Sequence, residues 1–235
     1  MSAQSCQIYF QTRSGKALTL NKQTLTDGTE AEIKSGGDGL NVVSDISFGQ
    51  YGVGETVTHG LAMFSDAGMY AFVLDGNGKI VMPIPVSTDV GAAGVVPLCR
   101  PLVVQNGMTV RALSTDTGGS QGANVSLSVY CADASVEVFT ATASGTTQEL
   151  VSIQTSQGIG KTLNGKRIIK AYAATPLMLD SGEATGFMGL PILSSEGYTK
   201  AVYAASNVLY GQPQSQDFPV VIEQNDKLQV TYDAS

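Results

Sequence analysis

Apolar and small polar residues alternate along much of this chain, and this period of two restricts its fold more than any other feature. The segment from Val125 to Val129 alternates without a break, and residues 108–111 and 228–232 do the same. Successive side chains of a strand point to opposite faces, so each segment can bury one face and expose the other. The branched Val, Ile and Thr side chains of these segments suit a pleated surface. The pattern therefore predicts strands.

Short turn sequences separate these segments at close intervals. They combine Gly with Asn, Asp or Thr at residues 26–28, 36–39, 75–78, 105–107, 117–119 and 163–165. Asn-Gly and Asp-Gly tolerate the positive φ angles that tight hairpins require. Many short strands with regular turns are typical of a sandwich or barrel. We expect an all-β fold, an antiparallel β-sandwich that resembles a jelly roll.

One stretch near the C-terminus fits a helix as well as strands. The residues that would share one helix face are Tyr198, Val202, Ala205 and Leu209. Residues 206–207, Ser-Asn, would instead serve as a turn between two short strands. We favour the strand pair.

The chain contains a weak internal repeat. Residues 101–110 resemble residues 219–230 when two single-residue insertions are allowed, with offsets from 118 to 120, and upstream Gly68-Met69-Tyr70 could correspond to Gly197-Tyr198. Two related β domains in tandem would produce this likeness. Any apolar strand, turn and strand would also produce it, so both explanations stay open.

The length of 235 residues fits either one large β domain or two small ones. Residues 140–147 are small and polar and have little to bury, which favours a linker there. We therefore expect an N-terminal β domain over 1–139 and a C-terminal β domain over 148–235. The alternative is one large sandwich over 1–235.

The charge content argues against a nucleic-acid partner. Only 14% of the residues are charged, the net charge is −7, and Lys166-Arg167 is the one adjacent basic pair. Contacts to phosphates supply most of the affinity for nucleic acids, and they need clustered basic side chains. Lasting protein interfaces, in contrast, are depleted of charged residues, because burying unpaired charge is costly.

The sequence shows neither a recognisable targeting segment nor a cysteine pattern of a known kind. The first residues show neither the basic nor the apolar region of a secretory signal, and no apolar stretch is long enough to span a bilayer. We expect a protein made in the cytosol, without a membrane partner. Cys6, Cys99 and Cys131 are odd in number and far apart, which fits neither a disulfide framework nor a metal site. We expect reduced, mostly buried thiols.

The sequence contains few of the residues that commonly serve in catalysis. His59 is the only histidine, so a general base of the common type would have to be built on it. It lies in an alternating segment with Glu55 and Val57 on the same face, which is typical of a structural strand residue. We expect no enzyme activity, no catalytic residue and no cofactor.

Two loops resemble ligand-binding motifs without completing them. Residues 158–162, Gly-Ile-Gly-Lys-Thr, resemble a phosphate-binding loop, but Thr155 occupies the position of its first glycine. Residues 75–79, Asp-Gly-Asn-Gly-Lys, resemble the start of a calcium loop, but Lys79 stands where a ligand belongs. We expect a hairpin turn there and no dedicated metal site, and calcium binding at Gly76 to Gly78 stays open.

Two proline-containing segments are candidates for an interface. Pro is excluded from central strands, so these segments could run extended along a partner or across the end of the protein's own barrel. The candidate interface residues are Pro83, Ile84, Pro85, Val86, Val95, Pro97 and Leu98.

Strand-turn segments such as 69–82 and 102–113, together with the abundance of Gly, Ser, Thr and Ala, resemble two groups of viral proteins. One is the head decoration, or cement, proteins of tailed phages, and the other is the small jelly-roll capsid proteins of tailless viruses. This resemblance implies a homo-oligomer, often a trimer at capsid three-fold positions, without a cofactor.

The expected function is that of a structural virion protein. It would bind and stabilise neighbouring shell subunits on the capsid surface, after assembly in the host cytoplasm. The alternative is a receptor- or glycan-binding β module of the fibre or adhesin type.

Overall fold

The computed structural model describes residues 5–23, 40–64, 68–87, 95–115, 123–143, 147–174, 187–205, 215–216 and 219–233. Its contacts divide the chain into two compact units, with a boundary at Gly118–Gly119. The first contains the described residues up to 115, and the second contains those from 123 onward. We call them unit 1 and unit 2.

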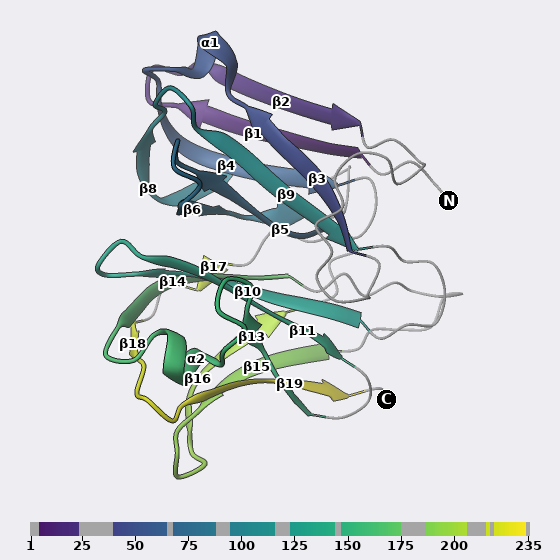
Figure 1. Cartoon of the computed structure of the whole chain (residues 1–235), viewed down its shortest axis with the longest axis vertical. Coiled ribbons are helices and arrows are strands. Elements are labelled where there is room, and N and C mark those ends of the chain that lie inside the picture. The colour runs from purple at the N-terminus through teal and green to yellow at the C-terminus, as the bar shows by residue number, and fades with distance from the viewer. Residues whose placement is uncertain are drawn as a thin grey trace. The chain divides into compact units, whose positions relative to one another are not determined.

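Unit 1 consists of two sheets and one helical turn. Its elements are β1 (Ser5–Thr12), β2 (Ala17–Gln23), β3 (Leu40–Ser47), α1 (Gly49–Gly52), β4 (Thr56–Phe64), β5 (Gly68–Leu74), β6 (Ile80–Ile84), β7 (Val86–Ser87), β8 (Val96–Val103) and β9 (Thr109–Thr115). One sheet has the order β2-β1-β4, with β8 and the short parallel β7 both on β4; the other has the order β3-β9-β5-β6 (Figure 1).

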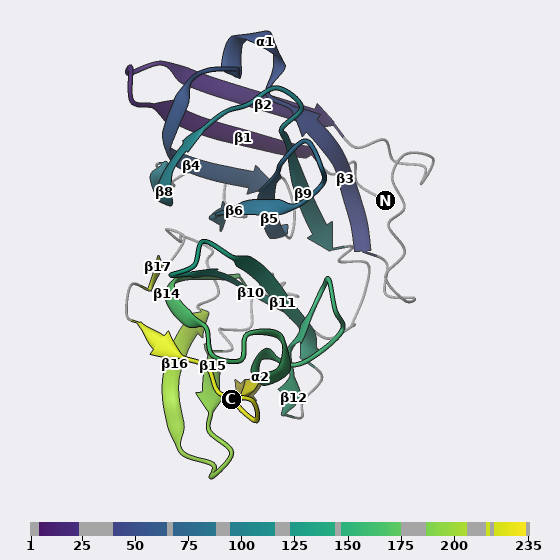
Figure 2. The same cartoon turned by 60° about the vertical axis from the view of Figure 1, so that its left-hand side comes forward.

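Unit 2 repeats this plan. Its elements are β10 (Ala123–Cys131), β11 (Val136–Ala143), β12 (Gln148–Glu149), β13 (Val151–Ser152), α2 (Ile159–Thr162), β14 (Arg167–Ala174), β15 (Phe187–Leu193), β16 (Thr199–Ala205), β17 (Ser215–Gln216), β18 (Val220–Val221) and β19 (Lys227–Asp233). One sheet has the order β13-β11-β10-β14, with β17 and β18 both on β14; the other has the order β12-β19-β15-β16 (Figures 1 and 2).

The strand pairs of both units are nested along the chain. In unit 1, the pair β5–β6 lies within β4–β8, which lies within β3–β9; in unit 2, β15–β16 lies within β14–β18, which lies within β12–β19. Such nesting is how the strands of a jelly roll follow one another. One difference from a jelly roll concerns β1 and β10. Each comes directly before its hairpin partner, β2 or β11, whereas in a jelly roll the strand at this place in the sheet usually comes from the end of the chain. The fold is therefore all-β and antiparallel, and it resembles a jelly roll, as expected.

Several turns of the two units also match. Each of these turns is closed by the same kind of backbone hydrogen bond in both units. The equivalent bonds are Thr12 N–Lys16 O and Cys131 N–Ser135 O, both 2.9 Å, Gly54 N–Val104 O and Gly165 N–Ile222 O, 2.8 and 2.9 Å, and Asp75 N–Lys79 O and Ser194 N–Tyr198 O, both 2.9 Å. This agreement supports a duplicated β unit and assigns each described residue of these turns a counterpart in the other unit.

The structural register simplifies the internal repeat seen in the sequence. Residues 101–110 correspond to 219–228 without insertions, because Val103 and Val221 occupy the same pairing position, as do Val104 and Ile222. The suggested match of Gly68-Met69-Tyr70 to Gly197-Tyr198 does not hold. Gly197 is the counterpart of Gly78, since both follow the first strand of equivalent hairpins at positive φ.

The boundary between the units lies earlier than the composition favoured. Residues 140–143 belong to β11 and pair with β10, so the small polar residues there form the end of a strand. Small and β-branched residues fit a pleated sheet as readily as a linker, which is why composition alone misplaced them. In the ambiguous C-terminal stretch, residues 199–205 form strand β16 rather than a helix, and residues 206–207 lie outside the described part of the chain.

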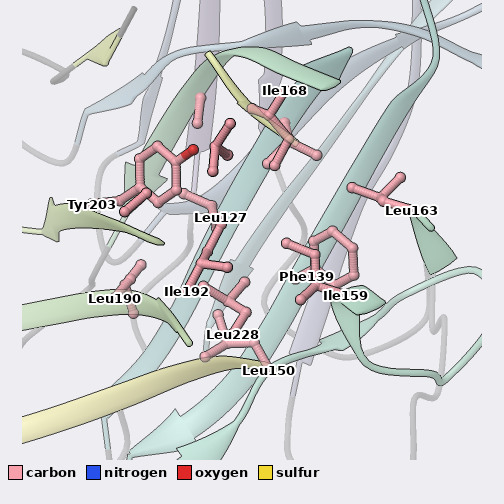
Figure 3. Packing of buried hydrophobic residues seen from close by; sticks show 14 of the residues in the cluster. Leu127, Phe139, Leu150, Ile159, Leu163, Ile168, Leu190, Ile192, Tyr203 and Leu228 are labelled. Atoms are coloured by element: carbon pink, nitrogen blue, oxygen red, sulfur yellow. The ribbon is translucent and has the colours of Figure 1, made fainter. Parts of the chain in front are cut away.

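Each unit has its own hydrophobic core between its sheets. In unit 1 the core includes Ile8, Phe10, Val57, Val73, Met82 and Val110, all at most 1% exposed. In unit 2, side chains from β10, β11, β15 and β19 meet those of α2 (Figure 3). The labelled members include Leu127, Phe139, Ile159, Leu190, Ile192 and Leu228. Alternate strand residues supply both cores, as the period of two predicts.

Candidate functional site

The predicted interface residues mostly lie inside unit 1. Ile84 and Leu98 are 1% and 5% exposed and belong to its core. Pro83 and Pro85 are buried, Val86 and Val95 are half-buried, and Pro97 alone among these seven is exposed. The two segments form the edge strands β6 and β8, where proline is tolerated. Ile84 and Leu98 are therefore part of the unit's own core, and Val86 packs against it.

His59 occupies a half-buried position on β4, opposite Gln11 of β1 and Pro97 of β8. Its Nδ1 atom lies 2.9 Å from the hydroxyl oxygen of Thr58. Within the described residues, no group of three or more His, Cys, Asp or Glu side chains is arranged to hold a metal ion. The side-chain contact that the structure gives this histidine is thus with its own neighbour on β4, Thr58.

The two motif-like loops are both used to hold their own unit together. In residues 75–79, Asp75 Oδ1 accepts hydrogen bonds from the backbone N–H groups of Asn77 and Lys79, both at 2.9 Å. This carboxylate therefore closes the predicted hairpin turn. In residues 158–162, the Gly160 N–H donates to Asp226 O at 3.1 Å instead of pointing into an open loop.

The most deeply buried charged residue described in unit 2, Asp226, forms an ion pair that joins the β18–β19 turn to strand β16. Lys200 Nζ donates to Asp226 Oδ2 at 2.8 Å, and these side chains are 13% and 1% exposed. Lys200 Nζ also lies 3.3 Å from Glu223 Oε2, and the Glu223 N–H donates to Asp226 Oδ2 at 2.8 Å. Asp226 Oδ1 has no hydrogen-bond partner among the described residues.

The electrostatics of Lys200 follow from these contacts. Burial acts to lower the pKa of Lys200, but the hydrogen bonds with Asp226 and Glu223 together outweigh it and raise that pKa. Lys200 therefore stays charged at neutral pH, and its hydrogen bond to Asp226 connects the two elements by a direct charge-assisted bond.

A second buried carboxylate, Glu137, lies on the inward face of β11. Its Oε1 atom accepts hydrogen bonds from Ser152 Oγ at 3.0 Å, from Gln154 Nε2 at 3.2 Å and from the Val138 N–H at 3.2 Å. Burial, only partly offset by these donors, raises the pKa of Glu137 above its ordinary value. The carboxylate connects the 152–154 turn to the start of β11.

Unit 1 has apolar side chains where unit 2 has these charges. The shared register places Leu18 at the position of Glu137 and Val81 at that of Lys200. Met108 likewise stands at the position of Asp226. Leu18 and Met108 are buried core residues. The buried charged residues of unit 2 therefore take the places that apolar side chains occupy in unit 1. Sequence reasoning missed them because the two halves of the repeat could not be aligned without the strand register.

Exposed apolar side chains gather at one end of unit 1. Tyr51, which follows the start of α1, is 84% exposed, and Val53 and Val103 are 44% and 51% exposed. The chain around Val53 lies next to Val103, because the Gly54 N–H donates to Val104 O at 2.8 Å. We call these three residues the Tyr51 patch.

The Tyr51 patch has one charged edge. Lys16 Nζ donates to Tyr51 O at 2.8 Å, lies 5.9 Å from the centre of the Tyr51 ring, and pairs with Glu55 at 3.3 Å. The basic end of Lys16 is thus partly neutralised. The patch offers an apolar, aromatic contact surface with little net charge, and no pattern in the sequence separates these residues from core positions.

The two cysteines whose side chains the structure describes are free thiols. Cys131 is buried in the core of unit 2 and Cys99 is half-buried. Burial raises the pKa of the Cys131 thiol, which keeps it protonated and unreactive.

Comparison with known proteins yields no relative. No family model matches the chain, and no curated protein and no solved structure matches it. Among the helices that the structure describes, none has the length and apolar character needed to cross a membrane.

Proposed function

We propose that this chain is a structural virion protein that binds the capsid surface and stabilises neighbouring shell subunits. It would act as a homo-oligomer, with a trimer as the expected state, and would join the particle in the host cytoplasm. It would have no catalytic role, and neither a cofactor nor nucleic acid would take part. The observation that carries this proposal is the Tyr51 patch, an apolar contact surface on a body built from two similar sandwiches.

The polar residues of the described structure support a mechanical role. Asp75, Glu137 and Asp226, which most resemble ligand or catalytic carboxylates, are all engaged in turns or in links between elements. Carboxylates used in this way stabilise the β-sheet framework and are not held ready to react. Repeated contacts by a symmetric oligomer on a symmetric shell give strong attachment even when each contact is weak.

The Tyr51 patch replaces the proline segments as the proposed contact with the shell. Aromatic side chains are enriched at the energetic centres of interfaces, and Tyr51 presents almost its whole side chain. Because the patch carries few unpaired charges, covering it costs little desolvation.

A binding assay on shells lacking this protein tests the proposal. The purified chain should bind such shells saturably, and a Tyr51→Ser, Val103→Ser variant should bind at least about tenfold more weakly, as expected for losing a central aromatic contact. The matched control is Val221→Ser, which changes the equivalent valine of unit 2, also 51% exposed. Absence of saturable binding, or equal loss in the control, contradicts the proposal.

The exposure of Tyr51 also favours one alternative, a receptor- or glycan-binding module. An exposed aromatic ring beside a basic side chain can stack on a sugar face. A glycan array would then show binding that Tyr51→Ala abolishes, while shells would show none. Shell binding without glycan binding would exclude this alternative.

A further inference from the structure

The chain contains three Asn-Gly pairs, and all three lie in turns that the structure describes. They are Asn77-Gly78, Asn106-Gly107 and Asn164-Gly165. In each pair the asparagine is exposed and the glycine has positive φ, between 76° and 82°. Exposure and local backbone conformation therefore do not distinguish them.

Asn-Gly is the sequence in which an asparagine amide is most open to attack by the next backbone nitrogen, because glycine has no side chain to obstruct it. The nitrogen of glycine forms a bond to Cγ of asparagine, and the Cγ–Nδ2 bond breaks. Ammonia leaves with the proton of the glycine nitrogen, and a five-membered imide remains. Water then opens the imide at either carbonyl to give aspartate or isoaspartate, with no change of oxidation state.

The attacking nitrogen is held in a hydrogen bond in two of the three pairs. The Gly78 N–H donates to Asp75 O at 2.9 Å, and the Gly165 N–H donates to Ile222 O at 2.9 Å. Each of these bonds must break before the nitrogen can attack. The Gly107 N–H makes no hydrogen bond with any described residue.

The comparison with Asn164-Gly165 is closely matched. Both asparagines occupy the second position of a four-residue turn closed by one backbone bond, Met108 N to Gln105 O at 3.2 Å in one and Lys166 N to Leu163 O at 2.8 Å in the other. Positive φ at the following glycine is what a type II turn requires. The closing bond is longer in the 105–108 turn, so this turn also opens more easily.

The geometry points to Asn106 as a modification site, at which the asparagine converts to aspartate or isoaspartate through attack by the Gly107 nitrogen, which no described residue holds in a hydrogen bond. The product adds one negative charge to a chain of net charge −7. Isoaspartate also lengthens the backbone of the turn that joins β8 to β9. Unit 2 carries Gln224 and Asn225 at these positions, so the site is confined to unit 1.

Peptide mapping by mass spectrometry of the folded full chain, aged in mildly alkaline buffer, tests this assignment. Asn106 should convert at least about fivefold faster than Asn164 and Asn77, the factor that one ordinary hydrogen bond represents. In denaturant the three rates should converge. Asn106→Gln should remove the dominant product and leave conversion at the other two sites unchanged.

Two results would overturn the assignment. One is conversion of Asn77 or Asn164 at a rate equal to that of Asn106 in the folded chain. The other is an Asn106 preference that persists unchanged in denaturant, because the neighbouring sequence rather than the free Gly107 nitrogen would then set the rate.

Discussion

At the scale of single residues, Gly160 makes the closest contact with backbone atoms among the described glycines of unit 2. A Cβ atom there would lie 2.5 Å from Asp226 O, 2.6 Å from Gln224 O and 2.8 Å from Asp226 N. These are backbone atoms of the β18–β19 turn, which cannot move aside cheaply. The contact explains why Gly occurs in a sequence that resembles a phosphate-binding loop.

Gly160→Ala should therefore destabilise unit 2 by about 3 kcal/mol, the upper range for overpacking. Chemical denaturation followed by a probe in unit 2 measures this loss. Gly189→Ala is the control, because its Cβ would meet only Val202 Cγ1 at 3.7 Å. Equal stability of the two variants would contradict the contact.

The Lys200–Asp226 pair gives a second prediction at this scale. Asp226→Met should cost about 3 kcal/mol of unfolding free energy, because it leaves Lys200 buried without its main partner. Adding Lys200→Val gives the pair found in unit 1, Met108 and Val81, and should recover much of that loss. A double-mutant cycle by urea denaturation measures the coupling. Additive effects would show that the pair is not coupled.

Glu137 makes unit 2 sensitive to pH in a defined direction. Burial raises its pKa from 4.5, so ionising it is harder in the folded protein than in the unfolded chain. Its stabilising contribution is complete below about pH 4.5 and is lost as the pH rises through the raised folded-state value. Glu137→Gln keeps the acceptor oxygen and should make unit 2 more stable at neutral pH and remove this loss. If the free energy of unfolding changed with pH in the same way for the unmodified chain and for Glu137→Gln, from acid to neutral pH, this prediction would be contradicted.

At the scale of elements, equivalent hairpins of the two units differ at one strained position. Gly15 in the β1–β2 turn has φ of 83°, and its counterpart in the β10–β11 turn is Ala134 with φ of 64°. Positive φ costs an alanine about 1–2 kcal/mol, which glycine avoids at a smaller entropic cost.

Ala134→Gly should therefore stabilise unit 2 by up to about 1 kcal/mol, while Gly15→Ala should destabilise unit 1. Thermal unfolding of the two variants measures both shifts. A loss of stability in Ala134→Gly would contradict the backbone strain inferred at Ala134.

Sequence reasoning predicted individual strands and turns better than it predicted any other feature. The hairpin around Asp75 to Gly78, the turn at Gln105 to Gly107 and the strand at Val125 to Val129 were predicted from alternation and turn chemistry. These signals are local, so one sequence suffices to find them. The candidate interface was not found in this way: Ile84 and Leu98 are apolar residues of edge strands, and only the fold decides whether such residues face the core.

At the scale of the whole molecule, the repeat was visible in the sequence only as a weak likeness. Equivalent positions carry different chemistry, as with Met108 and Asp226, and the offset between the units changes from 119 in the first hairpin to 118 in the last. A single sequence cannot align such segments without the strand register. The pairing order, once known, relates most strands of the two units, although β13 has no counterpart in unit 1.

The proposed role of the molecule predicts its abundance on particles. If the two-unit body holds neighbouring shell subunits together, its copy number must follow the symmetry of the shell. On this proposal a virus encodes the chain, and the direct measurement is quantitative mass spectrometry of that virus's purified virions. The predicted result is a fixed ratio to the shell protein that matches one class of symmetry axis, with three copies per three-fold position. Absence from virions, or a sparse and variable copy number, would contradict the account.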